Sequence, residues 1–213
     1  MTDPASFIRQ NTALLPPPLV PEVRLHLATD VVPLWRKTEE ELEKEGVPPP
    51  YWAFAWAGGQ ALARYVLDHP DAVRGKKVLD FGSGSGLVAI AAAKAGAAHV
   101  LAADIDKFAA AAIALNAEAN DARVEITKND VIGRDGDWQT ILCGDMCYER
   151  PLAERLLEWL TERMRAGALV LLGDPGRTYF PKSGVERLAT YNVQTTRELE
   201  DREIRETSVY RLG

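Results

Sequence analysis

The sequence predicts an α/β fold in which a mostly parallel sheet is covered by helices on both faces. From residue 77 to residue 174, short apolar runs alternate with helical segments, a pattern typical of parallel strands joined by crossover helices. Several apolar runs are nearly continuous, as expected of strands buried on both faces. The tail after residue 190 alternates apolar and polar residues, which predicts a terminal antiparallel pair of strands.

Each expected element can be read from its local pattern. Ala61, Leu62, Tyr65 and Val66 recur at helical spacing until Pro70 and predict the first helix of the domain. The expected strands that follow span residues 77–81, 99–104, 123–130, 140–145 and 168–174, and the final pair lies within 191–212 with its turn near 200–202. The expected helices between them span 86–96, 106–120 and 151–167. Together these elements predict a Rossmann-like, doubly wound sheet of seven strands.

Residues 1–50 have a different composition. The proline clusters in "LLPPPLVPEV" and "GVPPP" exclude regular helix and mark turns or extended segments. Between them, "LWRKTEEELEKEG" predicts a short solvated helix or a charged loop. We therefore expect residues 1–50 to be an extension that packs on one main domain, residues 51–213.

Composition limits the class of protein. The chain has 213 residues, 46% hydrophobic and 26% charged, which is typical of a soluble globular domain, and a net charge of −6 argues against nucleic acid as a partner. It lacks an uninterrupted apolar run of about 18 residues, so we expect no membrane partner. The first residues resemble neither a secretory signal nor a transit peptide, which predicts a cytoplasmic protein. Cys143 and Cys147 are too few for a structural zinc site, so we expect reduced thiols and no metal.

A glycine turn marks the expected ligand site. "GSGSG" follows the strand 77–81, and in such a sheet ligands bind at the carboxyl ends of the strands. Glycines let the backbone approach a ligand closely, and the next helix presents unpaired N–H groups. We therefore expect Gly82, Ser83, Gly84 and Gly86 to contact a nucleotide-like cofactor.

Asp80 discriminates between the candidate cofactors. Residues 84–89 fit the pattern G-x-G-x-x-A, which alone is a weak dinucleotide signal. A carboxylate at Asp80 would repel the pyrophosphate of NAD, whereas it would attract the methionine ammonium of S-adenosylmethionine, directly or through the adjoining backbone and water. The glycines are not followed by the lysine of a phosphate-binding loop. The sequence therefore predicts S-adenosylmethionine.

Other positions fit the same cofactor. Asp104 can accept hydrogen bonds from both ribose hydroxyls, with Ile105 under the adenine ring, although an acid here could also only cap a loop. Asn129 and Asp130 are placed at the adenine edge, and the sequence does not decide which of them contacts it. The aromatic cluster "YWAFAW" can be core, but its position before the first helix suggests a wall over the cofactor that includes Trp56.

The strand 140–145 ends in "GDMCY", at the expected point of methyl transfer. Gly144 would contact the cofactor, Asp145 could accept a hydrogen bond from an incoming amine, and Tyr148 could supply a ring face and a hydroxyl. An ordinary strand-to-helix turn with a capping aspartate is the alternative. Asp174 and Arg177 in "GDPGR" border the same cleft, and contact with substrate or stabilisation of the turn are both open.

These motifs resemble a known family. "VLDFGSGSG", "AADID" and "GDMCYE" resemble the class I, seven-β-strand S-adenosylmethionine-dependent methyltransferases, whose lysine-methylating branch shares a D-x-x-Y/F motif after the fourth strand. The longer segments narrow the resemblance to the electron-transfer flavoprotein beta-subunit lysine methyltransferases, over nearly the whole chain. Those segments are "FIRQNT", "PEVRLHL", "YWAFAWAGGQALARYVLD", "VRGKKVLDFGSGSG" and "LGDPGR".

The resemblance implies a protein-lysine N-methyltransferase that modifies lysines beside the partner-recognition loop of the flavoprotein beta subunit and so weakens electron delivery to it. It also implies cofactor and acceptor-site roles for Trp56, Gly82, Gly84, Asp104, Gly144, Asp145 and Tyr148. Three alternatives remain open: methylation of another protein such as a ribosomal subunit, methylation of a small amine such as nicotinamide, and a regulatory module that binds the cofactor without turnover.

Overall fold

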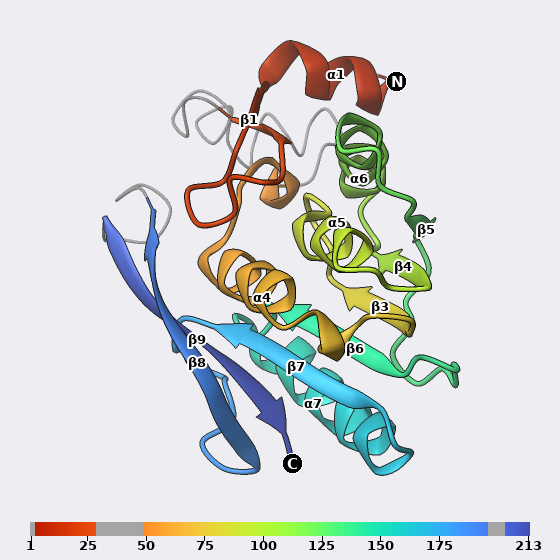
Figure 1. Cartoon of the computed structure of the whole chain (residues 1–213), viewed down its shortest axis with the longest axis vertical. Coiled ribbons are helices and arrows are strands. Elements are labelled where there is room, and N and C mark those ends of the chain that lie inside the picture. The colour runs from red at the N-terminus through yellow and green to blue at the C-terminus, as the bar shows by residue number, and fades with distance from the viewer. Residues whose placement is uncertain (1–2, 29–48, 196–202) are drawn as a thin grey trace.

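A seven-stranded sheet runs through the part of the chain that this computed structural model describes, residues 3–28, 49–195 and 203–213 (Figure 1). The strand order is β5-β4-β3-β6-β7-β9-β8; β3 to β7 are parallel, and β9 runs antiparallel to both β7 and β8. The predicted mostly parallel sheet with a C-terminal antiparallel pair is confirmed. The strands are β3 (Lys77–Phe81), β4 (His99–Ala103), β5 (Glu125–Thr127), β6 (Thr140–Gly144), β7 (Leu169–Asp174), β8 (Val185–Gln194) and β9 (Ile204–Leu212).

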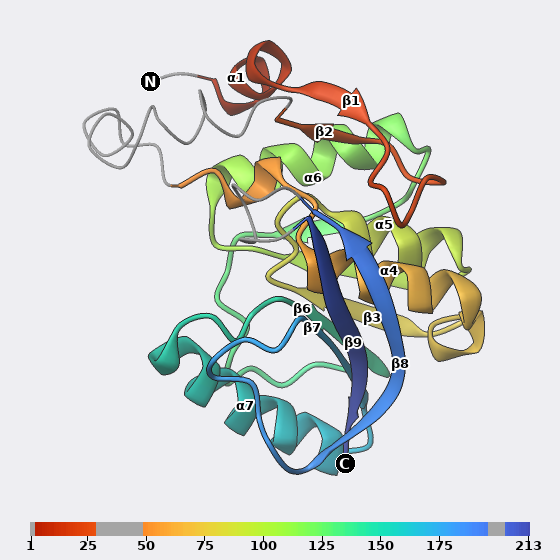
Figure 2. The ribbon, with the colours of Figure 1, turned by 90° about the vertical axis from the view of Figure 1, so that its left-hand side faces the viewer.

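Helices cover both faces of this sheet, as predicted. Helices α4, α5 and α6 lie on one side and α7 lies on the other (Figure 2). Two short 3₁₀ helices, η1 and η2, flank α4. The bounds are η1 (Tyr51–Ala53), α4 (Ala57–Asp68), η2 (Pro70–Ala72), α5 (Leu87–Lys94), α6 (Lys107–Ala119) and α7 (Arg150–Arg165). Strand β8 begins six residues earlier than expected because its first half, Val185–Thr190, lacks the alternation that marks the tail.

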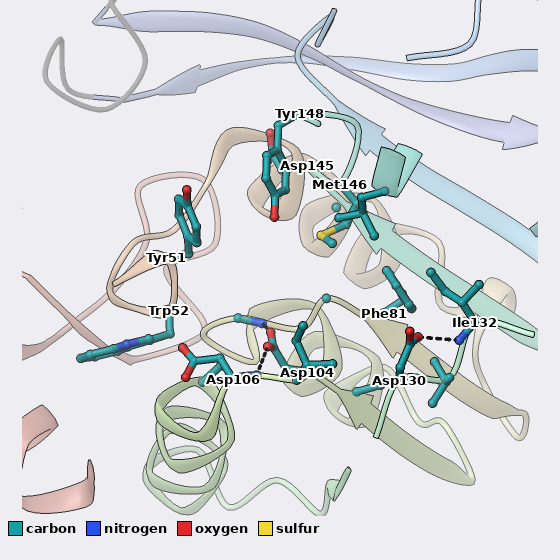
Figure 3. A pocket seen from close by; sticks show the side chains of 18 of the residues that line it. Tyr51, Trp52, Phe81, Asp104, Asp106, Asp130, Ile132, Asp145, Met146 and Tyr148 are labelled. Carbon is teal, nitrogen blue, oxygen red and sulfur yellow. Dashed lines mark hydrogen bonds between the residues drawn. The ribbon is translucent and has the colours of Figure 1, made fainter. Parts of the chain in front are cut away.

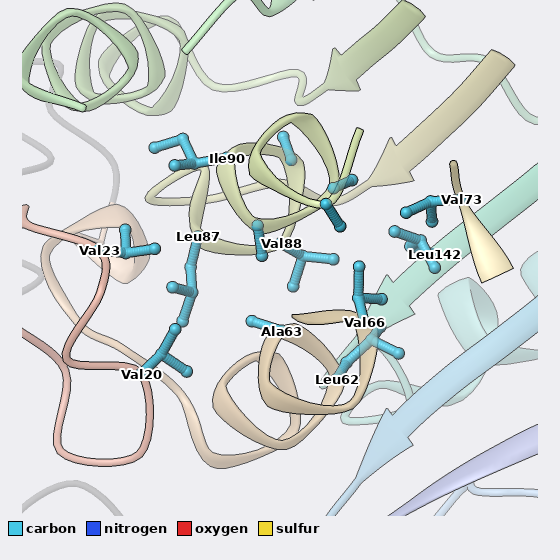
Figure 4. Close-up of a cluster of buried hydrophobic side chains, with 14 of the residues drawn as sticks. Val20, Val23, Leu62, Ala63, Val66, Val73, Leu87, Val88, Ile90 and Leu142 are labelled. Carbon is cyan, nitrogen blue, oxygen red and sulfur yellow. The ribbon is translucent and has the colours of Figure 1, made fainter. Parts of the chain in front are cut away.

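Alternate residues of the central strands supply two hydrophobic cores. On the α4 and α5 side, Val78 and Leu142 pack with Leu62 and Leu87 (Figure 4). On the α7 side, Leu79 and Ile141 pack with residues that include Leu156, Trp159 and Leu160. Full burial of each such side chain contributes about 1.5–3 kcal/mol, so the two cores clamp the sheet and hold the strand ends that carry the site.

The N-terminal region packs on the face of the sheet that α4, α5 and α6 cover. Helix α1 (Pro4–Asn11) is capped by Asp3, whose Oδ2 accepts from the N–H of Ser6 (3.0 Å), and it was not predicted because the proline clusters dominate the pattern. Strands β1 (Ala13–Leu15) and β2 (Leu25–Leu27) follow as a small antiparallel pair. Ile8 of α1 is buried in one cluster with Phe108 of α6.

The division of the chain at residue 50 stays a prediction. The predicted charged helix or loop, residues 34–46, lies outside the described residues, and so does the predicted turn at 200–202. Val20 and Val23 nevertheless join the α4 and α5 core (Figure 4). The described part of the N-terminal region therefore shares a core with the main domain.

The first turn of α4 touches the end of β7 without an intervening side chain. A Cβ built on Gly58 would overlap the carbonyl oxygen of Gly173, and a Cβ built on Gly173 would overlap the carbonyl oxygen of Gly58. The same atom on Gly58 would lie 2.6 Å from Oδ2 of Asp145. Both glycines are therefore required by the closeness of two backbones.

We predict that Gly58→Ala lowers the free energy of unfolding by about 1–3 kcal/mol, because the added methyl overlaps backbone that cannot rotate away. The neighbouring Gly59→Ala is the matched control, since a Cβ there has no heavy atom within 4 Å. Alanine in a helix is favoured over glycine, so the control should be as stable as the parent or up to about 1 kcal/mol more stable. Urea unfolding measures both, and equal stability of the two variants would contradict the close contact.

Candidate active site

A cavity of about 580 Å³ opens at the carboxyl ends of the parallel strands (Figure 3). It lies where the sequence predicts a ligand, and most of the predicted site residues line it. Those residues are Trp56, Gly82, Gly84, Asp104, Ile105, Asn129, Asp130, Gly144, Asp145 and Tyr148. Asp80, Ser83 and Gly86, which were also predicted to contact the cofactor, are not among its lining residues.

The glycine turn is shaped by backbone conformations that other residues rarely adopt. Gly82, Gly84 and Gly86 all have positive φ, at 63°, 53° and 82°. A Cβ on Gly82 would also overlap the sulfur of Met146, so this part of the turn lies directly against the loop after β6. The N–H of Gly84 donates to Oδ2 of Asp104 (2.8 Å), which ties the turn to the end of β4.

Asp80 lies beneath the turn, almost fully buried. Its Oδ2 accepts from the Ser83 hydroxyl (2.5 Å) and from the N–H of Ala89 in the first turn of α5 (3.0 Å). Burial raises the pKa of this carboxyl to about 7. Of the two routes considered for the cofactor ammonium, the adjoining backbone fits the geometry better, because Phe81 and Gly82 line the cavity. A contact between Asp80 and the cofactor stays a prediction.

Asp104 is held rigidly at the rim of the cavity. Besides the bond from Gly84, its Oδ1 accepts from the N–H of Asp106 (3.0 Å). Burial raises the pKa of the Asp104 carboxyl above its ordinary value. Ile105 beside it is 76% exposed, which is unusual for so large an apolar side chain, and it faces the cavity. The predicted contacts of Asp104 with the ribose and of Ile105 with the adenine ring stay predictions, and both residues line the cavity.

The two candidates for the adenine edge differ in their partners. Asp130 already accepts from the N–H of Ile132 (2.9 Å; Figure 3) and forms an ion pair with Arg155 (2.9 Å). The backbone N–H of Asn129 donates to Oγ1 of Thr127 (3.2 Å), and Asn129 also lines the cavity. Which of the two contacts the adenine remains open.

Asp145, at the opposite end of the cavity, has all its carboxylate lone pairs engaged. Its Oδ2 accepts from the N–H groups of Gly58 and Gly59, the latter at 3.2 Å. Its Oδ1 accepts from Nε (3.0 Å) and Nη2 (2.7 Å) of Arg177. The residue also has positive φ, 59°, a conformation that residues other than glycine rarely adopt. The predicted acceptor role toward an incoming amine requires the exchange of one of these bonds, and it stays a prediction.

Aromatic rings form the wall beside Asp145. The ring of Tyr148, 41% exposed, lies 6.0 Å from that of Tyr51, which in turn lies 6.0 Å from Trp56. Indole Nε1–H of Trp56 donates to the carbonyl oxygen of Tyr51 (2.9 Å). Such rings can surround a methylated cation without donating a hydrogen bond to it. The aromatic wall was predicted through Trp56 and Tyr148, whereas Tyr51 was noted only as a member of the cluster.

Of the cavity residues with charged or sulfur-containing side chains, Asp106, Met146 and Arg155 were not assigned to the site from the sequence, and Arg177 was left open between two roles. Asp106 caps α6 and Met146 lies inside "GDMCY", so proximity to assigned residues could have indicated both. Of the two roles left open for "GDPGR", stabilisation of the turn applies to Asp174, and contact with substrate stays a prediction for Arg177. Asp174 stabilises the turn, because its Oδ1 accepts from the N–H groups of Gly176 and Arg177 (2.7 Å each), while the Arg177 side chain reaches the cavity.

Cys143 and Cys147 are buried and unpaired, and burial raises the pKa of both thiols. Within residues 3–28, 49–195 and 203–213, no group of three or more potential metal ligands occurs. None of the helices in these ranges is long and apolar enough to cross a membrane.

The raised pKa of Asp80 predicts a pH-dependent stability. In the native state the carboxyl keeps its proton up to about pH 7, whereas in the unfolded chain it loses the proton near its ordinary value of 3.8. The native state therefore binds more protons between these values, and the free energy of unfolding falls as the pH rises from about 4 to about 7. Asp80→Asn, which cannot titrate, should remove part of that fall, measured by urea unfolding of cofactor-free protein.

Asp137→Asn is the control for this experiment. Asp137 is exposed, and its hydrogen bond with Lys77 lowers its pKa, so its removal should not reduce the loss of stability toward pH 7. A stability profile of Asp80→Asn parallel to that of the parent would show that Asp80 does not carry the effect.

Comparisons with known proteins agree on one enzyme class. A family model described as Ribosomal protein L11 methyltransferase (PrmA) matches residues 60–144. Structures with the same fold include magnesium protoporphyrin IX methyltransferase from Synechocystis with bound SAM (TM-score 0.54, 16% identity, 100% of this chain and 99% of that chain). They also include a SAM-dependent methyltransferase from Geobacter sulfurreducens in complex with S-adenosyl-L-homocysteine (TM-score 0.52, 16% identity, 71% of this chain and 90% of that chain).

Relatives that match over most of their length are more specific. The electron transfer flavoprotein beta subunit lysine methyltransferase of Xenopus laevis is 43% identical, over 98% of this chain and 87% of that protein. The human protein of the same name is 42% identical, over 85% of this chain and 70% of that protein. With this identity across the cavity, the sheet and the N-terminal region, the chain belongs to the family of electron transfer flavoprotein beta subunit lysine methyltransferases.

Proposed function

We propose that this protein transfers a methyl group from S-adenosylmethionine to lysine in the beta subunit of an electron transfer flavoprotein. The observation that carries the proposal is the 43% identity with the Xenopus laevis lysine methyltransferase over 98% of this chain. A match over 98% of the chain extends beyond the cofactor turn to residues 51–56 and 173–177, which supply Tyr51, Trp52, Trp56 and Arg177 to the cavity wall.

The residues of the cavity fit the cofactor. Gly82 and Gly84 allow close approach of the backbone, Asp104 offers a fixed carboxylate for the ribose hydroxyls, and Ile105 offers an uncovered apolar surface for the adenine. When bound, S-adenosylmethionine supplies a methyl carbon that a lysine nitrogen attacks as the C–S bond breaks and its electron pair stays on sulfur.

The target lysine binds at the end of the cavity that holds Asp145 and Tyr148. A free lysine has a pKa of about 10.4, so its ammonium must lose a proton to water before the nitrogen has a lone pair for the attack. Tyr148 and Tyr51 restrict the direction of approach, and because burial raises the pKa of Tyr148 to about 12, its hydroxyl stays neutral at physiological pH. Orientation of the nitrogen is then the principal contribution of the protein.

A second protein target has one observation in its favour. The match to the ribosomal protein L11 methyltransferase model covers residues 60–144, from α4 to the end of β6. This segment includes the cofactor turn and Asp104 but excludes Tyr51, Tyr148 and Arg177 at the reacting end. The match therefore supports the cofactor site and does not identify the acceptor, so the flavoprotein remains our proposed substrate.

The proposal is tested by incubating the protein with methyl-labelled cofactor and purified electron transfer flavoprotein, followed by mass spectrometry of the peptides. We expect label on at least one lysine of the beta subunit. If no lysine of the beta subunit is labelled but another protein in a cell lysate is, the enzyme has a different target. If a lysate and a panel of small amines, including nicotinamide, also stay unlabelled, the protein is a binding module.

Asp104→Ala should weaken cofactor affinity by about 100-fold or more, because two hydrogen bonds to a charged group are lost. Calorimetry with S-adenosylmethionine measures this affinity. Asp104→Asn, which keeps an acceptor for the N–H of Gly84, should have an affinity between those of the parent and Asp104→Ala. Asp137→Ala, a surface aspartate outside the cavity, is the control and should bind normally. Retained affinity in Asp104→Ala would mean that another residue holds the ribose.

A further inference from the structure

A turn after β7 places the side chain of Arg177 at the end of the cavity that holds Asp145. Oδ1 of Asp174, at the end of β7, accepts from the N–H of Gly176 and of Arg177 itself (2.7 Å each). The guanidinium then lies with its Cζ 5.9 Å from the ring centroid of Trp56 and donates to Oδ1 of Asp145 through two nitrogens. Three elements, β6, β7 and the start of α4, meet at this side chain.

This arrangement has a chemical consequence for a lysine methyltransferase. Asp145 and Tyr148 both line the cavity, so an amine bound between them would lie close to the carboxylate of Asp145. A carboxylate with a vacant oxygen would form an ion pair with a lysine ammonium and hold the proton on the nitrogen. The protonated nitrogen has no lone pair, so such an ion pair would oppose methyl transfer.

We propose that Arg177 is a positioning residue for methyl transfer: by occupying Oδ1 of Asp145, its guanidinium prevents an ion pair between that carboxylate and the target lysine, which can then lose its proton to water. This inference rests on the proposed function. Gly58 and Gly59 occupy the other oxygen, so the carboxylate is closed from both sides.

The other charged or titratable groups near Asp145 do not replace Arg177 as the partner of its carboxylate. Asp174, whose pKa burial raises to about 6, faces its turn. Cys143 and Cys147 stay protonated because burial raises their pKa values, and Tyr148 stays neutral for the same reason. Tyr51 contributes a ring to the wall. Arg177 is thus the cation paired with Asp145 among the described residues of the cavity.

The test is the pH profile of methylation, with saturating cofactor and flavoprotein, of the parent and of Arg177→Gln. In the variant, the lysine ammonium takes the vacated place on Asp145, so the profile should move to higher pH by about one unit or more. The rate should fall about tenfold at pH 7, with a smaller loss above pH 9, while the KM for the flavoprotein stays equal or falls. Cofactor affinity by calorimetry should be unchanged.

Two further variants separate charge from structure. Arg177→Lys keeps the cation and should keep the parent profile, although it loses the paired donation. Asp145→Asn combined with Arg177→Gln removes both charges, so the alkaline shift should disappear even if the rate stays low. Arg155→Gln is the control at the other end of the cavity; it should alter cofactor KM without moving the profile.

The outcomes separate this inference from the proposed function. An equal loss of rate at every pH in Arg177→Gln, or a shift that persists in the double variant, would overturn the role of Arg177. If the parent itself does not label the flavoprotein, the proposed substrate is wrong, and the same variants are then compared on the protein that the parent does label.

Discussion

The contact between the first turn of α4 and the ends of β6 and β7 is the constraint on which the site depends. Gly58 and Gly173 meet backbone to backbone, and a Cβ on Gly144 would lie only 3.0 Å from the Cα of Gly59. This closeness brings two helical N–H groups to Asp145 and sets Trp56, the residue before the helix, over the cavity. Larger residues at these positions would separate the aromatic wall from the strand that carries the reacting residues.

Two buried aspartates accept hydrogen bonds from the beginnings of two helices, and their different partners give them different properties. Asp145 accepts hydrogen bonds from N–H groups of α4 and pairs with Arg177. Asp80 accepts from an N–H group of α5, and its other partner among the described residues is the hydroxyl of Ser83. Burial raises the pKa of both carboxyls, but the guanidinium of Arg177 opposes the rise at Asp145, whereas a hydroxyl and a backbone N–H oppose it at Asp80. The same residue type thus supports a charged pair at the reacting end and a proton-retaining cap beneath the cofactor turn.

Much of this arrangement was predictable from the sequence, because it depends on local pattern. Alternating strands and helices indicated the sheet, and the position of Asp104 and Tyr148 after strands placed them at the edge where the cavity lies. What could not be predicted depends on approach in three dimensions. The saturation of Asp145 by α4 and Arg177 joins residues far apart in the chain, and Asp80 lies behind the turn because its side chain points toward α5. Helix α1 was missed because the proline clusters that follow it dominate the pattern of the N-terminal region.

Ile105 is 76% exposed at the rim of a cavity whose other large apolar residues are mostly covered. In the ligand-free protein, water must be ordered around this side chain, and an aromatic ring placed on it would release that water. Burial of apolar surface on binding has a characteristic signature, a negative change in heat capacity. Cofactor binding should therefore become more exothermic as the temperature rises, and the uncovered surface of Ile105 contributes to that change.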